Sequence, residues 1–166
     1  MTTWQRFEAE APGLAAEVRA RLEEYNHHVL ATLRRDGSPR LSGTEVEFRG
    51  PDLTIGMMLG AVKARDLRRD PRYALHTNPG EASMEEGDAK LSGVAVEVTD
   101  PAEFEALVGA EAPAGSFDLF LLRLDRVTLT AVRNDVLIIE SWRPGEPRVR
   151  YERMPNGPAV RIVLRS

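Results

Sequence analysis

A lysine at the start of a short helix is the residue of this sequence best placed to do chemistry. Leu53–Met58 has the composition of a buried strand, and Gly60 interrupts it. Residues 61–70 are then typical of a short helix that stops at Pro71. The first N–H groups of a helix lack an intrahelical partner and carry the positive end of its dipole. A phosphate there would also gain charge from Lys63, so the stretch predicts an anion site.

The same stretch has a second interpretation, an ordinary basic helix whose cations face water. Short basic runs are common, and this one contains Lys63, Arg65, Arg68 and Arg69. Its glycine spacing is not that of a Walker loop, and no strand leads into the glycine fingerprint of a dinucleotide-binding fold. The residues alone leave the two interpretations open.

Composition limits the class of protein. With 166 residues, of which 42% are hydrophobic, we expect one domain over residues 1–166 with its own core. The net charge of -4 argues against a nucleic-acid binder, and the absence of cysteine excludes disulfides and thiolate sites. The first residues lack the apolar core of a signal peptide, and no apolar run approaches the roughly 20 residues that span a bilayer. We therefore expect a cytoplasmic protein that binds no membrane.

The elements expected around the lysine are mostly strands joined by turns. Three short helices are predicted, at Pro12–Tyr25, at residues 61–70, and after Asp100 to about Val108. Six or seven strands are expected; among them are Val29–Leu33, Leu41–Phe48, Val136–Trp142, Arg148–Arg153 and a long Ser116–Val132 that bends near Arg123–Arg126. Closure removes exposed edges, so the prediction is a mainly β fold, a small β-barrel with flanking helices.

This order of elements resembles the pyridoxamine 5'-phosphate oxidase-like split β-barrel family, which binds flavins and deazaflavins. The motifs that carry the resemblance are Leu-Arg-Arg-Asp-Pro-Arg at residues 67–72 and Trp142-Arg143. The resemblance covers about residues 12–152. It leaves 154–166 as a tail, in which Val160–Leu164 is either a strand or disordered.

The resemblance implies a homodimer that binds FMN, or alternatively the deazaflavin coenzyme F-420, at the subunit interface. Lys63 and the helix start would hold the phosphate, while the strand ending at Met57 and Met58 would present its backbone to the isoalloxazine ring. The cofactor-binding residues implied are Ser42, Gly43, Met57, Met58, Lys63, Arg65 and Trp142. Partner-chain residues near Trp142 would cover the ring, and the alternative for Trp142 itself is a role in the core alone.

Two positions depart from the family pattern near the lysine. Related sequences often have a basic residue where this chain has Ala61, and an asparagine where it has Asp66. A carboxylate near a phosphate is repulsive, so replacing Asp66 with asparagine is expected to strengthen cofactor binding. Arg65 or Arg40 could supply the missing cationic contact.

The function implied is an FMN-dependent oxidoreductase that transfers hydride to or from a small organic substrate. The first alternative is a deazaflavin (F-420)-dependent reductase, and the second is a non-catalytic cofactor binder or a relative that has lost the site. No nucleophile and base pair is visible, so no catalytic residue is named. Three histidines without a carboxylate at ligand spacing predict no metal site, and a surface or structural role for each.

Two further expectations concern surfaces. The apolar positions Val94, Val96, Val98, Leu119 and Leu121 supply more apolar strand surface than a barrel interior needs, which favours an obligate dimer. The acidic stretch Glu81–Asp88 has little apolar content, so we expect it to be a mobile loop.

Overall fold

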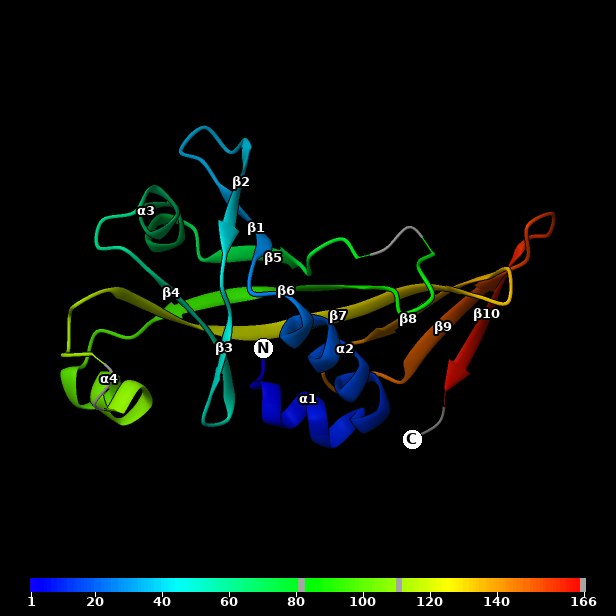
Figure 1. Ribbon diagram of the computed structural model, residues 1–166, viewed down its shortest axis with the longest axis horizontal. Coiled ribbons are helices and arrows are strands. Elements are labelled where there is room, and N and C mark those ends of the chain that lie inside the picture. Colours follow the sequence, from blue (N-terminus) through cyan, green and yellow to red (C-terminus); the bar gives the residue numbers. More distant parts are fainter. Residues whose placement is uncertain (81–82, 110–111, 165–166) are drawn as a thin grey trace.

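The computed structural model describes residues 1–80, 83–109 and 112–164, and the strands of these ranges form an antiparallel sheet (Figure 1). The helices are α1 (Trp4–Glu10), α2 (Pro12–Glu24), α3 (Val62–Arg69) and α4 (Pro101–Val108). The strands are β1 (His28–Leu33), β2 (Pro39–Thr44), β3 (Glu47–Arg49), β4 (Asp52–Met57), β5 (Arg72–His76), β6 (Asp88–Glu97), β7 (Asp118–Arg133), β8 (Val136–Trp142), β9 (Arg148–Arg153) and β10 (Ala159–Leu164). The prediction of a mainly β fold with flanking helices is confirmed.

Strand β7 is the longest element and joins the two parts of the sheet. The main path runs β10-β9-β8-β7-β6-β5-β1-β2, while β4 pairs with β3 and with the first residues of β7. Strands β8, β9 and β10 extend the sheet as a ribbon at one end of the molecule, and α4 lies at the opposite end (Figure 1). The barrel part therefore positions β1, β2, β4 and α3, and the ribbon lies apart from them.

A β-bulge divides β7 where the sequence predicts a bend. The register between β6 and β7 shifts at Ser92/Gly93, so that Asp125 has no partner in the ladder. A Cβ atom on Gly93 would lie 1.8 Å from the carbonyl oxygen of Arg123, so only glycine fits. The bend expected near Arg123–Arg126 is confirmed.

The core has two parts, and the second corrects an expectation. Helices α1 and α2 pack on the sheet through a cluster that includes Trp4, Phe7, Val18 and Trp142. Helix α4 covers a separate cluster, formed by Val98, Phe104, Val108, Leu119 and Leu121. The apolar positions Val98, Leu119 and Leu121 are therefore buried within the chain and do not offer a surface to a second copy, whereas Val96 is 44% exposed.

Two elements differ from the sequence prediction, and a third had been left open. The strand predicted at Leu41–Phe48 is two strands, because β2 pairs with β1 whereas β3 pairs with β4. Helix α1, which was not predicted, begins at the N-cap Thr3 and buries Trp4 and Phe7. The tail forms β10, which pairs with β9 along its whole length, so the choice left open for Val160–Leu164 resolves to a strand.

Two other expectations concern an acidic loop and membrane-spanning segments. The predicted mobile loop at Glu81–Asp88 lies partly outside the described residues, because 81 and 82 are not among them. No helix in the described ranges is both long and apolar enough to cross a membrane.

Candidate functional site

The helix start predicted as an anion site lies beside β2. Gly60 leads into α3, and its N–H donates to Oδ2 of Asp118 at 3.0 Å, which ties the loop after β4 to the start of β7. The N-cap residue, Ala61, provides no side-chain hydrogen bond to the helix. The first-turn amides of α3 therefore remain available to a ligand.

Lys63 joins this helix start to β2. Its Nζ donates to the carbonyl oxygen of Gly43 at 2.6 Å. Burial lowers the pKa of Lys63, and the nearby Glu45 carboxylate opposes that shift. A Cβ atom on Gly43 would meet nothing within 4 Å, so space remains open beside the strand. The structure thus brings Lys63 and Gly43 together, with Ser42 next to them, as the resemblance implied.

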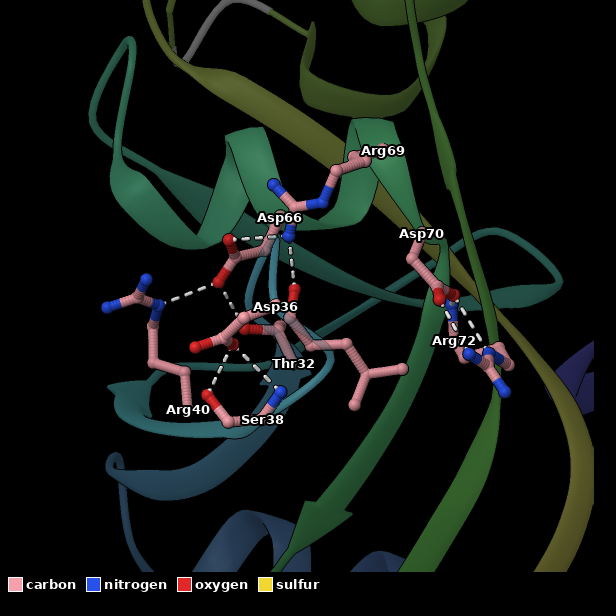
Figure 2. A network of polar contacts seen from close by, with 9 residues as sticks. Thr32, Asp36, Ser38, Arg40, Asp66, Arg69, Asp70 and Arg72 are labelled. Carbon is pink, nitrogen blue, oxygen red and sulfur yellow. Dashed lines mark hydrogen bonds and ion pairs between the residues drawn. The ribbon is translucent and has the colours of Figure 1, made fainter.

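Asp66 has a different environment from the one expected. It is 3% exposed, and its Oδ2 accepts hydrogen bonds from Thr32 Oγ1 at 3.0 Å and from Arg40 Nε at 2.6 Å. Its Oδ1 accepts one from Arg69 Nη2 at 3.0 Å (Figure 2). Asp66 is therefore not an exposed carboxylate that faces a ligand. The expectation that it repels a bound phosphate assumed an unpaired carboxylate, and that assumption is wrong.

The hydrogen bonds around Asp66 also set its charge state. Burial on its own would raise the pKa of this carboxyl group, but the bonds from Arg40, Arg69 and Thr32 outweigh that effect and leave the pKa below its usual value. Arg69 also donates through Nη2 to the carbonyl oxygen of Leu33. The cluster of Asp66, Arg40, Arg69 and Thr32 fastens α3 to the β1–β2 hairpin.

The remaining predicted residues near α3 are placed as follows. Met57 is buried in the core, whereas Met58 is 84% exposed and its carbonyl oxygen accepts the Ala61 N–H at 3.1 Å. Arg65 is exposed on α3, and its side chain makes no hydrogen bond or ion pair within the described residues. Met58 and Arg65 are therefore exposed near the helix start, whereas Met57 packs in the core.

Trp142 does not join these residues. Its side chain is 1% exposed, its ring lies 4.7 Å from that of Phe7, and its Nε1 donates to Glu10 at 3.1 Å. The ring is enclosed by α1 and the sheet of its own chain, so it is not available to cover a cofactor. Trp142 is a core residue, and the cofactor role implied by the resemblance does not fit this burial.

Sequence reasoning missed Thr32, Arg69 and Asp118 as parts of the site. One signal for the pairing of Asp66 was present, because this residue stands between the apolar positions Ala64 and Leu67, where a charged side chain needs partners. Nothing in the sequence marks Thr32 or Asp118. Groups of three or more His, Cys, Asp or Glu residues that could hold a metal ion are absent from the described ranges.

Several solved structures have a fold similar to that of this chain. A heme binding protein from Mycobacterium smegmatis has 22% identity and a TM-score of 0.62, over 80% of this chain and 58% of that one. PhzG from Burkholderia lata, solved with tetrahydrophenazine-1-carboxylic acid, has 16% identity and a TM-score of 0.57, over 96% and 92%. The conserved protein Rv2991 from Mycobacterium tuberculosis has 19% identity and a TM-score of 0.57, over 68% and 81%. At these identities the likeness concerns the fold alone.

The sequence itself identifies the family. The profile described as pyridoxamine 5'-phosphate oxidase matches residues 14–132, which include β1, β2, α3 and the whole Asp66 cluster. This range is most of the chain and lies within the 12–152 expected from the motifs. The split-barrel prediction is confirmed, and the chain belongs to the pyridoxamine 5'-phosphate oxidase family.

Proposed function

We propose that the protein binds flavin mononucleotide and acts as an oxidoreductase, transferring hydride between FMN and a small organic substrate. The observation that carries the proposal is the position of Lys63, whose ammonium group lies between an uncapped helix start and β2. The ammonium group has three donors, and its contact within the described residues is the carbonyl oxygen of Gly43. A phosphate group would accept hydrogen bonds from the other donors and pair with the charge of Lys63.

The residues present fit the phosphate end and one edge of such a cofactor. The first-turn amides of α3 and Lys63 would hold the phosphate, because both offer donors with positive charge. The open space beside Gly43 would admit a flat ring next to the backbone of β2. Met58 lies exposed at the end of β4 and would border the ring.

The cofactor and the protein have separate roles in this proposal. A bound flavin supplies the hydride chemistry, so the protein needs only to bind, orient and shield it. A cationic pocket of this kind favours the dianionic phosphate monoester of FMN over a ligand phosphate with less charge.

Haem binding, which is stated of the M. smegmatis protein, is not supported near Lys63, because the histidines lie at the other end of β1 or are already hydrogen-bonded. His28 begins β1 and is buried with both ring nitrogens in hydrogen bonds, to Leu22 O and from Asn78 N. His76 pairs with Val29 across β1 and β5, also at the end of β1 away from Asp66. The remaining histidine, His27, precedes His28 in the chain.

The proposal includes a homodimer that covers the cofactor. Leu41 is 72% exposed on β2, and Met58 and Leu59 are exposed at the helix start, so apolar side chains surround the candidate site. Apolar groups gathered at one place on a surface favour contact with another surface. Light scattering at micromolar concentration should give the mass of two chains, and a monomer mass would contradict this part of the proposal.

The cofactor is tested by titrating the purified protein with FMN, riboflavin and F-420 and following ligand fluorescence. FMN should bind most tightly. Lys63→Ala should weaken FMN binding at least tenfold, about 1.4 kcal/mol, because one charge-assisted contact is lost. Lys90→Ala is a matched control, since Lys90 lies on β6 and donates to Asp88 and Thr130.

The outcomes separate the function classes. Tighter binding of F-420 than of FMN would favour the deazaflavin reductase. Absence of binding by all three ligands would favour a relative that has lost the site, and a Soret absorption band in the purified protein would favour a haem binder. Equal FMN dissociation constants for wild type and Lys63→Ala would show that α3 is only a solvated basic helix.

A further inference from the structure

We infer that Asp66 is a positioning residue, which holds Arg40 as a second cationic contact beside Lys63 and so makes the site select a phosphate monoester. The inference rests on the proposed function, because it assigns a role in recognising the same cofactor. It concerns a residue at which this chain departs from the family pattern, and it reverses the sign of the effect expected for Asp66 from the sequence.

Asp66 is held in one orientation by three elements. Thr32 belongs to β1, Arg40 to β2 and Arg69 to α3, and their donors lie 2.6–3.0 Å from the two carboxylate oxygens. Two guanidinium groups outweigh one carboxylate, so the cluster as a whole has a net positive charge. A ligand phosphate near it would meet a cationic surface and not an uncompensated acid.

Arg40 is attached to Asp66 by only one of its nitrogens. Its Nε donates to Asp66 Oδ2, whereas Nη1 and Nη2 have no hydrogen bond or ion pair within the described residues. Figure 2 shows no contact between either terminal nitrogen and the other residues drawn. The side chain of Arg40 is 23% exposed, so its position is restricted while its terminal donors stay accessible. An arginine held through Nε is preorganised to bind an anion through its other nitrogens.

The contacts of Asp66 and Lys63 bring Arg40 near the helix start. Residues three apart on a helix are neighbours, with about 5–6 Å between their Cβ atoms, so Lys63 and Asp66 lie on one side of α3. Arg40 and Ser42 share the face of β2 opposite to Leu41 and Gly43. With Arg40 bonded to Asp66 and Lys63 bonded to Gly43, two cations line the gap between β2 and α3.

Two fixed cations favour a phosphate monoester over ligands with less charge. The dianionic phosphate of FMN can interact with both Lys63 and Arg40, a diester carries only one negative charge, and riboflavin carries none. Arg40 would thereby replace the basic residue that is absent at Ala61. Loss of the Asp66 carboxylate would release Arg40 to several rotamers, and ordering it again would weaken FMN binding.

A purely structural role for Asp66 makes a different prediction. If the cluster only fastens α3 to β1 and β2, Asp66→Asn should weaken the binding of FMN and riboflavin by the same factor. The positioning role predicts a loss for FMN with little change for riboflavin. The ratio of the two dissociation constants therefore distinguishes the two roles.

The experiment is a double-mutant cycle with Asp66→Asn, Arg40→Gln and the double variant, each titrated with FMN and with riboflavin. Asp66→Asn should weaken FMN binding by about threefold to tenfold, and Arg40→Gln by about tenfold. In the Arg40→Gln background, Asp66→Asn should have no further effect. Asp70→Asn is the matched control, because Asp70 follows α3 and binds Arg72 on the other side (Figure 2).

Each outcome has one meaning, and circular dichroism first establishes that each variant is folded. Tighter FMN binding by Asp66→Asn, equal losses for both ligands, or additive effects in the cycle would overturn the positioning role while leaving the proposed function intact. If Asp66→Asn fails to fold, Arg40→Gln decides alone, and unchanged FMN affinity would overturn the inference. If the wild-type protein binds neither FMN nor F-420, the proposed function fails first, and the inference falls with it.

Discussion

Among the described residues, two buried carboxylates are each paired with two arginines, and they serve different parts of the sheet. Asp66 lies under α3 in the barrel part and binds Arg40 and Arg69. Glu140 lies in the ribbon, is 6% exposed, and accepts hydrogen bonds from Arg148 at 2.9 Å and from Arg150 at 3.1 and 2.8 Å. The two clusters thus have the same charges.

The difference lies in how the arginines are used. Arg150 stands directly opposite Glu140 in the β8–β9 ladder and donates to it through both Nε and Nη2, so this fork fixes the register of two strands. Arg148 lines an open groove of about 670 Å³, but Glu10 and Glu146 line it too and make it unsuitable for a phosphate. Of these two clusters within the described residues, the Asp66 cluster is the one on α3, and it leaves both terminal nitrogens of Arg40 without a hydrogen bond. Composition alone therefore does not decide whether such a cluster binds a ligand.

The largest effect is expected in the ribbon. Glu140→Ala leaves two partly buried guanidinium groups without a counter-charge, and we expect it to lower the free energy of unfolding by roughly 2–4 kcal/mol. FMN affinity should stay at its wild-type value, because the ribbon lies apart from α3. Urea denaturation and an FMN titration of the same preparation measure the two quantities.

A matched control for this variant is Glu152→Ala. Glu152 contacts Arg150 at 3.6 Å on the surface, and its loss should change the free energy of unfolding by less than about 1 kcal/mol. If Glu140→Ala weakens FMN binding as much as Lys63→Ala does, the claim that the Glu140 cluster only supports strands is wrong. The ribbon would then contribute to the site.

The sequence predicted the ribbon better than it predicted the site. The strands Val136–Trp142 and Arg148–Arg153 were predicted with the observed bounds, because turn residues bracket each of them. Leu41–Phe48 was predicted as one strand, because alternation continues along the chain while the pairing partner changes between β2 and β3. Side-chain periodicity contains no information about partners.

The same limit applies to single residues of the site. Lys63 was predicted because a lysine in the first turn of a helix after a strand has a local signature, and its role in binding stays a prediction. The role of Trp142 was left open between the core and the cofactor, because a tryptophan that packs on Phe7 and one that covers a ring look alike in a sequence. The partners of Asp66 come from β1 and β2 as well as α3, and contacts of that separation follow only from the tertiary fold.

An intermediate effect is expected from acid. The pKa of Asp66 is below its ordinary value of 3.8 in the folded protein, so the unfolded chain binds a proton more readily at this residue. The stability that the cluster provides is therefore present above about pH 4 and is lost as the pH falls through the folded pKa. Asp66→Asn should be less stable than wild type at pH 7, and the difference should narrow toward pH 2. A constant difference over that range, measured by urea denaturation, would show that the ionised form of Asp66 is not the stabilising one.

The smallest effect is expected from salt, and it sharpens the contrast between a cluster that binds a ligand and one that only supports strands. Lys63 and Arg40 are partly exposed, so salt screens their attraction for a phosphate dianion; the Debye length falls from about 10 Å at 0.1 M to about 3 Å at 1 M. Raising sodium chloride from about 0.05 to 0.5 M should weaken FMN binding a few-fold and leave riboflavin binding unchanged. The dependence should be shallower for Arg40→Gln, because one of the two cations is gone, and unchanged for Arg148→Gln in the ribbon. An equally steep dependence for wild type and Arg40→Gln would mean that Arg40 does not interact with the phosphate, although its guanidinium group is held against α3 by Asp66.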